Sequence, residues 1–184
     1  MKKLAFIFLG VLLSAATFAQ HPPADTYILL KPDRVFDGAD MHAGWWVLVK
    51  NNHIAAVGEP ASIKAPASAK IIDLKGTTLM PGMIEGHSHL FLHPYNETSW
   101  DDQVLTESRA ERTARAVQHA KVTLMAGFTT VRDLGTEGCG YDDVGLKTAI
   151  EKGVIPGPRM LVATRAIVAT GSYGPKVLVP EADV

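Results

Sequence analysis

The sequence has little cysteine and little net charge, and each shortage excludes something. Cys139 is the single cysteine, so no disulfide can form within the chain, and stability must come from packing or from a bound metal. The thiol lies between two glycines with no activating base nearby, which favours an incidental loop cysteine over a catalytic one. The formal net charge is −1 and long basic runs are missing, so nothing indicates a nucleic-acid or anionic-membrane partner.

Long apolar runs are also scarce, and the clearest one stands at the N-terminus. Lys2 and Lys3 precede apolar residues 4–13, and small residues ending in Ala19 follow, a pattern typical of a secretory signal peptide over residues 1–19. An uncleaved anchor is the alternative, but a spanning helix needs 18 or more apolar residues. Without a cysteine near the cleavage position, we expect a periplasmic or secreted protein that is not a lipoprotein and has no membrane attachment after cleavage.

A strand-like apolar segment that starts at Leu79 leads to two histidines, His87 and His89. Side chains two residues apart on a strand point the same way, with backbones about 6.6 Å apart at roughly 3.3 Å per residue. Two such imidazoles can bind one zinc ion, although a catalytic site needs further ligands and an open position for water. Because the chain has seven histidines, the spacing alone leaves open two unrelated polar side chains at a strand end.

Residues 26–78 consist of short β-like runs separated by turn residues. Asp37-Gly38, Asn51-Asn52 and a proline-containing linker at 59–67 break the pattern. His42 and His53 fall in this region, and we expect both to be surface or turn residues rather than metal ligands. Trp45 and Trp46 are adjacent, so on a strand one would pack inward. The expected strands are 27–30, 45–49, 54–57 and 71–74, which predict part of a small β-sandwich domain.

Several sequence blocks occur in one order between Arg34 and Gly174, and together they resemble the amidohydrolase superfamily, specifically its secreted imidazolonepropionase-like or Xaa-Pro dipeptidase-like members. Glu85 is a departure, since relatives usually carry Asp two residues before the first histidine. The blocks are Val35-Phe36-Asp37-Gly38, Ile54-Ala55-Ala56-Val57-Gly58, the segment from Leu79 to His89, Ala126-Gly127-Phe128-Thr129-Thr130-Val131-Arg132-Asp133, and Ile155-Pro156-Gly157-Pro158-Arg159-Met160.

The resemblance implies an α/β fold: the start of a (β/α)₈ metal-dependent hydrolase barrel, preceded by part of the β-sandwich and incomplete as given. Such a barrel alone takes about 250 residues, so we expect an N-terminal fragment in which 79–184 supply the first three β/α units. The expected helix ends at Gly127 and is capped by Ser108 or begins one turn earlier; its apolar stripe is Ala110, Ala114, Val117, Leu124 and Met125. The expected strands are 79–84, 128–131 and 159–163, and a short helix is expected at 143–152.

In this resemblance His87 and His89 match two metal ligands of the first strand. The implied cofactor is one or two divalent metals, zinc by ligand type, which activate water to cleave a carbon–nitrogen bond in a small amide, cyclic amide or dipeptide. The family's carboxylated lysine, two further histidines and aspartate base have no match here, and Lys121, His119 and Asp133 are not assigned those roles. The catalytic residues are therefore unknown.

The alternative is a catalytically inactive truncated fragment. For the polypeptide as given we expect no significant hydrolase activity, because most ligands are missing. We also expect poor solubility, because a barrel stopped after three strands has two open sheet edges.

Three further candidates lie near the same strand ends. His93, beside Pro94, could touch substrate, but a solvated loop histidine is favoured. Arg132 and Asp133 are expected to form an ion pair that props the site, rather than Arg132 binding a substrate carboxylate. Tyr173 lies in a glycine-flanked loop where many relatives have histidine, so a role for it is doubtful.

Overall fold

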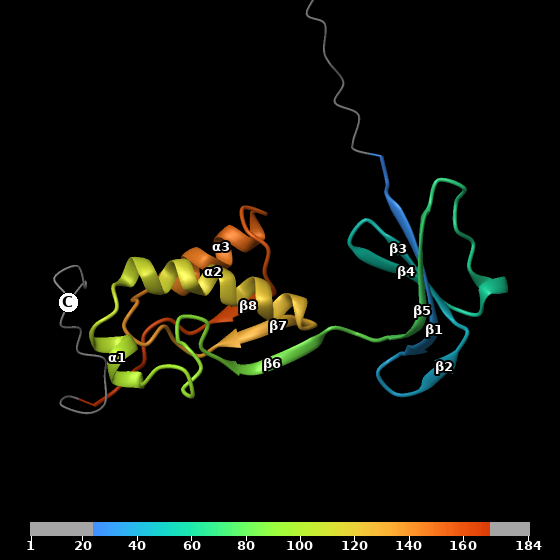
Figure 1. The fold of residues 1–184 in the computed structure, drawn as a ribbon. Coiled ribbons are helices and arrows are strands. Elements are labelled where there is room, and N and C mark those ends of the chain that lie inside the picture. The colour runs from blue at the N-terminus through green and yellow to red at the C-terminus, as the bar shows by residue number, and fades with distance from the viewer. Residues whose placement is uncertain (1–23, 170–184) are drawn as a thin grey trace, which may run out of the picture. The chain divides into compact units, whose positions relative to one another are not determined.

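The computed structural model describes residues 24–169, so the expected signal peptide at 1–19 and Tyr173 lie outside the described residues. The chain divides into two compact units between Met80 and Pro81 (Figure 1). Within residues 24–169, no helix combines the length and apolar character needed to cross a membrane. Each unit is described by itself below.

The first unit is a five-stranded sheet built around one long strand, β1. This strand pairs with β2 and β3 antiparallel and with β5 parallel, and β4 pairs with β3. Asn51, with φ +56°, makes the turn between β3 and β4 that the Asn51-Asn52 pair predicted. A second sheet of a sandwich stays a prediction. The bounds are β1 Tyr27–Phe36, β2 Met41–Ala43, β3 Trp46–Lys50, β4 His53–Gly58, a 3₁₀ turn η1 Pro60–Ser62, and β5 Lys70–Leu79.

His42 makes more side-chain contacts than we expected of a surface or turn histidine. Its ring stacks on that of Trp45, with centroids 3.6 Å apart, and its Nε2 lies 2.9 Å from Asp37 Oδ2. The backbone N–H groups of Asp40 and Ala39, and then His42, hold the pKa of Asp37 well below its usual range. Trp45 precedes β3, so the expected inward and outward alternation of the two tryptophans does not apply. His53 is exposed, as expected.

The second unit is a three-stranded parallel sheet in the order β6-β7-β8. Helices α2 and α3 lie side by side over one face of it (Figure 1). Ser108 Oγ accepts the Glu111 N–H, which confirms the predicted cap, and Gly127 (φ +97°) follows the last turn of α2. The bounds are β6 Met83–Ser88, α1 Trp100–Leu105, α2 Arg109–Met125, β7 Phe128–Asp133, α3 Asp142–Glu151 and β8 Arg159–Val162.

One expectation about the second unit is wrong and another holds only in part. The strand expected at 79–84 begins later, because Leu79 still pairs with Val35 in the first sheet and proline and glycine follow. The buried face of α2 matches the expected stripe only in part. Val117 packs against the core, but Ala110, Ala114 and Met125 are exposed, and the fully buried residues are Arg112, Ala116 and Ala120.

Cys139 lies in a loop, as expected, and its side chain belongs to the core of the second unit. It is fully buried in a cluster with Phe91, Ala116, Val131 and Leu146. Burial raises the pKa of the thiol to about 11.

We therefore expect Cys139 to react slowly with thiol reagents in the native protein. Raising the pKa from 9.0 to about 11 lowers the thiolate fraction at neutral pH about 100-fold, and burial excludes the reagent as well. Titration with a chromogenic disulfide reagent, with and without guanidinium, measures the two rates. Equal rates in the two conditions would contradict the burial of this side chain.

Candidate metal centre

His87 is the fifth residue of β6, and His89 lies just beyond the end of this strand. Their ring centroids are 5.3 Å apart, and the ring planes meet at 62°. At Zn–N distances of about 2.0–2.1 Å and a tetrahedral angle, two bound imidazoles have ring centres roughly 5 Å apart. The spacing of the two rings therefore fits two ligands of one ion.

The ring of His89 is oriented by a backbone carbonyl. Its Nδ1 lies 3.0 Å from the carbonyl oxygen of Gly135, and because a carbonyl only accepts, Nδ1 carries the proton. Nε2 is then the nitrogen with a lone pair, as in metal-binding histidines whose other ring nitrogen donates to a carbonyl or carboxylate. Glu85, the departure noted in the sequence, accepts the backbone N–H of His87 at 2.9 Å.

Asp133 joins the end of β7 to the segment that contains His89. It is fully buried, and its two oxygens accept the N–H groups of Leu90 at 2.9 Å and Gly135 at 3.2 Å. Burial raises the pKa of Asp133 to about 6, against the opposite effect of these two hydrogen bonds. The backbone N–H of Leu134 also donates a hydrogen bond to the Ser88 carbonyl at 2.8 Å.

Arg132 and Asp133 do not form the predicted ion pair. Adjacent strand residues point to opposite faces, so Asp133 is buried under the helices while Arg132 is exposed on the other face. Arg132 Nε donates instead to the Gly86 carbonyl at 2.7 Å, which ties β7 to β6 on that face.

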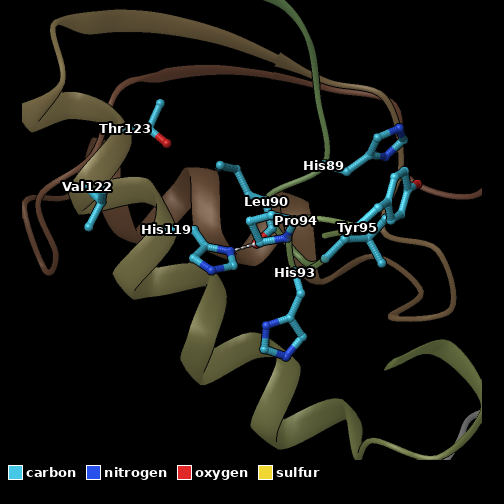
Figure 2. A pocket seen from close by; sticks show the side chains of 9 residues that line it. His89, Leu90, His93, Pro94, Tyr95, His119, Val122 and Thr123 are labelled. Carbon is cyan, nitrogen blue, oxygen red and sulfur yellow. Dashed lines mark hydrogen bonds between the residues drawn. The ribbon is translucent and has the colours of Figure 1, made fainter. Parts of the chain in front are cut away.

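A cavity of about 400 Å³ opens between the segment after β6 and helix α2 (Figure 2). His89, Leu90, His93, Tyr95, His119 and Val122 contribute to its wall. Figure 2 shows the rings of His93 and His119 near each other on one side, with His119 Nδ1 donating to the Leu90 carbonyl at 2.9 Å. The cavity therefore lies next to the candidate pair, and His89 is the member of the pair that lines it.

His93 is half-buried and not the solvated loop histidine that was expected. Its backbone N–H donates to Gln103 Oε1, and its Nε2 lies 3.0 Å from Glu107 Oε1. Glu107 also accepts from Arg115 at 2.6 Å. These partners lie 10 and 14 residues beyond His93, so no local sequence pattern predicted them.

In the part of the chain that the structure describes, no group of three or more His, Cys, Asp or Glu side chains is arranged to hold a metal ion. Within residues 24–169, His87 and His89 therefore offer two candidate ligands, and a metal held there would need other ligands or water to complete its coordination. The donor set fits a divalent transition metal, because neutral imidazole suits such ions.

Comparisons with known proteins show which family the chain is similar to. The model of the amidohydrolase family matches residues 78–178, more than half of the chain. A dihydroorotase from Syntrophus aciditrophicus (strain SB) is 41% identical over 64 residues, which are 34% of this chain and 15% of that protein.

Two solved structures are similar over most of this chain. One is an amidohydrolase, 34% identical with a TM-score of 0.63, covering 77% of this chain and 32% of its own. The other is a Xaa-Pro dipeptidase with methionine bound in its active site, 26% identical with a TM-score of 0.68, covering 81% and 36%. The chain spans about a third of the length of these structures.

Proposed function

The chain belongs to the amidohydrolase family, and we propose that the protein is a metal-dependent hydrolase of carbon–nitrogen bonds in a small amide, cyclic amide or dipeptide. The observation that carries the proposal is the pair His87 and His89, with ring centres 5.3 Å apart. The fixed tautomer of His89 supports it, because Nδ1 is occupied by Gly135 and Nε2 is left for a ligand.

In this proposal His87 and His89 hold a divalent metal, zinc by ligand type, at the carboxyl end of β6. When bound, the metal supplies a water of lowered pKa and polarises the substrate carbonyl. Gly135 orients His89 through its carbonyl oxygen, and Arg132 holds β6 and β7 together next to the pair. Whether one or two ions bind depends on ligands other than these two.

We also propose that β6, β7 and β8 are the first three strands of a (β/α)₈ barrel. The strands are parallel, the helices cover one face, and the histidines lie at the carboxyl end, where barrel enzymes carry their sites. The sheet of the first unit then belongs to a β-sandwich side domain. The N-terminal run after Lys2 and Lys3 supports a periplasmic or secreted location.

For the substrate, we favour a dipeptide with proline in the second position, because a Xaa-Pro dipeptidase is similar over 81% of this chain. A cyclic amide is the second candidate, supported by the identity with a dihydroorotase over 64 residues. An inactive protein is the remaining candidate, supported by the missing third ligand among residues 24–169.

Metal removal tests the proposal. We expect the full protein to hydrolyse Xaa-Pro dipeptides or a cyclic amide of the dihydroorotate type, to lose that turnover on dialysis against a chelator, and to regain it with Zn²⁺. Ninhydrin detection of released proline, or absorbance of the cyclic amide, measures the rate. Turnover that survives complete metal removal, or a metal-loaded protein that cleaves no carbon–nitrogen bond, would contradict the proposal.

A further inference from the structure

Asp133 forms hydrogen bonds with two backbone segments next to His89. One of its oxygens accepts the N–H of Leu90, the residue after His89, at 2.9 Å. The other accepts the N–H of Gly135, whose own carbonyl receives Nδ1–H of His89 at 3.0 Å. The backbone beside His89 and the partner of its ring are thus fixed by the same carboxylate.

We infer that Asp133 is a positioning residue that keeps His89 in the tautomer with Nε2 available to a metal. The inference rests on the proposed function, since it concerns one of the proposed ligands. Asp133 does not touch the ring of His89 and acts through Gly135.

A carboxylate is the side chain that this position requires. Both oxygens of a carboxylate accept hydrogen bonds, whereas an asparagine has one accepting oxygen and an NH₂ group that would face a backbone N–H. Asp133 is fully buried, so water does not replace a lost bond there. An asparagine would therefore leave either Leu90 or Gly135 without its acceptor.

Gly135, which supplies the carbonyl partner of His89, has a backbone conformation that favours glycine. Its φ is +127°, and a Cβ at this position would lie 3.1 Å from the carbonyl oxygen of Thr164. Thr164 also accepts the N–H of Thr136 at 3.2 Å. The segment that carries the carbonyl partner of His89 is consequently held from two directions, by Asp133 and by Thr164.

Asp143 offers a matched control. It is also fully buried and also accepts two backbone N–H groups, from Thr164 at 2.8 Å and from Val144 at 2.9 Å. It makes no hydrogen bond to Leu90 or Gly135. A loss of stability common to buried carboxylates should therefore appear in Asp143→Asn as well, whereas the effect on His89 should be smaller, because Asp143 reaches the segment of Gly135 only through Thr164.

The experiment compares Asp133→Asn and Asp143→Asn in the full protein, with Zn²⁺ as the probe. We expect Asp133→Asn to weaken zinc affinity about 10- to 100-fold in chelator competition, the range typical of partners that orient metal-binding histidines. Asp143→Asn should leave the affinity within about twofold while both variants lower the melting temperature. Equal zinc affinities in the two variants would overturn the inference.

A second measurement needs no metal and does not depend on the stability of Asp133→Asn. Ring ¹⁵N shifts of His89 in the metal-free wild-type protein, assigned by loss of the signal in His89→Gln, should show a single tautomer protonated at Nδ1. A tautomer mixture or protonation at Nε2 would contradict the positioning role. If zinc fails to bind wild type while the Nδ1 tautomer is present, the proposed function fails and the positioning of the ring stands.

Discussion

Replacement of Arg112 by methionine is expected to lower the free energy of unfolding by about 3–5 kcal/mol. The guanidinium is buried, and it donates from Nε to the Phe91 carbonyl at 3.2 Å and from its two terminal nitrogens to Thr136 and Glu137 at 2.8 Å each. Methionine fills much of the same space but offers no donor. Carbonyls left without a partner in a buried setting cost about 1–3 kcal/mol each, and the three costs overlap because the backbone relaxes.

Urea unfolding followed by circular dichroism measures this effect. Lys121→Met is the control, because it removes an exposed cation from the same helix and should change stability by no more than about 0.5 kcal/mol. Arg112→Lys should fall between wild type and Arg112→Met, since one ammonium group cannot reach all three carbonyls. An Arg112→Met protein as stable as the control would show that the three hydrogen bonds carry no net stability.

Arg112 also links the two segments that surround His89. Phe91 follows the segment that carries His89, whereas Thr136 and Glu137 follow Gly135, the partner of its ring. Burial lowers the pKa of Arg112, but a guanidinium stays charged in proteins, so its hydrogen bonds persist across the working pH range. The same side chain that stabilises the second unit therefore also supports the candidate metal centre.

Helix α2 shows where sequence patterns succeed and where they fail. Its ends were predicted correctly, because a serine cap and a glycine stop act on neighbouring backbone groups. Its buried face was predicted only in part, at Val117, because the expected stripe counted apolar side chains alone. The helix instead buries Arg112 with two alanines, and the buried arginine is accounted for by three carbonyls from distant segments, which no period in the sequence reveals.

The candidate site divides in the same way. The alternation of side chains along a strand predicted that His87 and His89 lie near each other. Their ring centroids are 5.3 Å apart, although the strand ends between the two residues. The hydrogen bonds that position His89 were not predictable. The one that Leu90 N–H donates to Asp133 spans 43 residues, and the one between His89 and the Gly135 carbonyl spans 46. Such contacts depend on the parallel pairing of β6 with β7, and parallel pairing sets contacts that the local sequence does not encode.

Replacement of either proposed ligand should have the largest effect on activity. In the full protein, the proposed function predicts that His87→Ala and His89→Ala each lower kcat/KM for the dipeptide or cyclic amide at least about 1,000-fold, because metal catalysis contributes several kcal/mol and each 1.36 kcal/mol is a factor of ten. Zinc content, measured by mass spectrometry of the metal in purified protein, should fall with the rate. The two variants should remain folded, since neither ring belongs to the buried core of the second unit.

His53→Ala is the matched control for this pair, because it removes an exposed histidine from the other unit and should retain both zinc and turnover. Exposed histidines can bind zinc weakly, so the comparison separates metal held by the pair from metal held elsewhere on the surface. If all three variants keep the same zinc content and rate, His87 and His89 are not metal ligands. If only His89→Ala loses zinc, the ring fixed by Gly135 is the dominant ligand and exposed His87 contributes less.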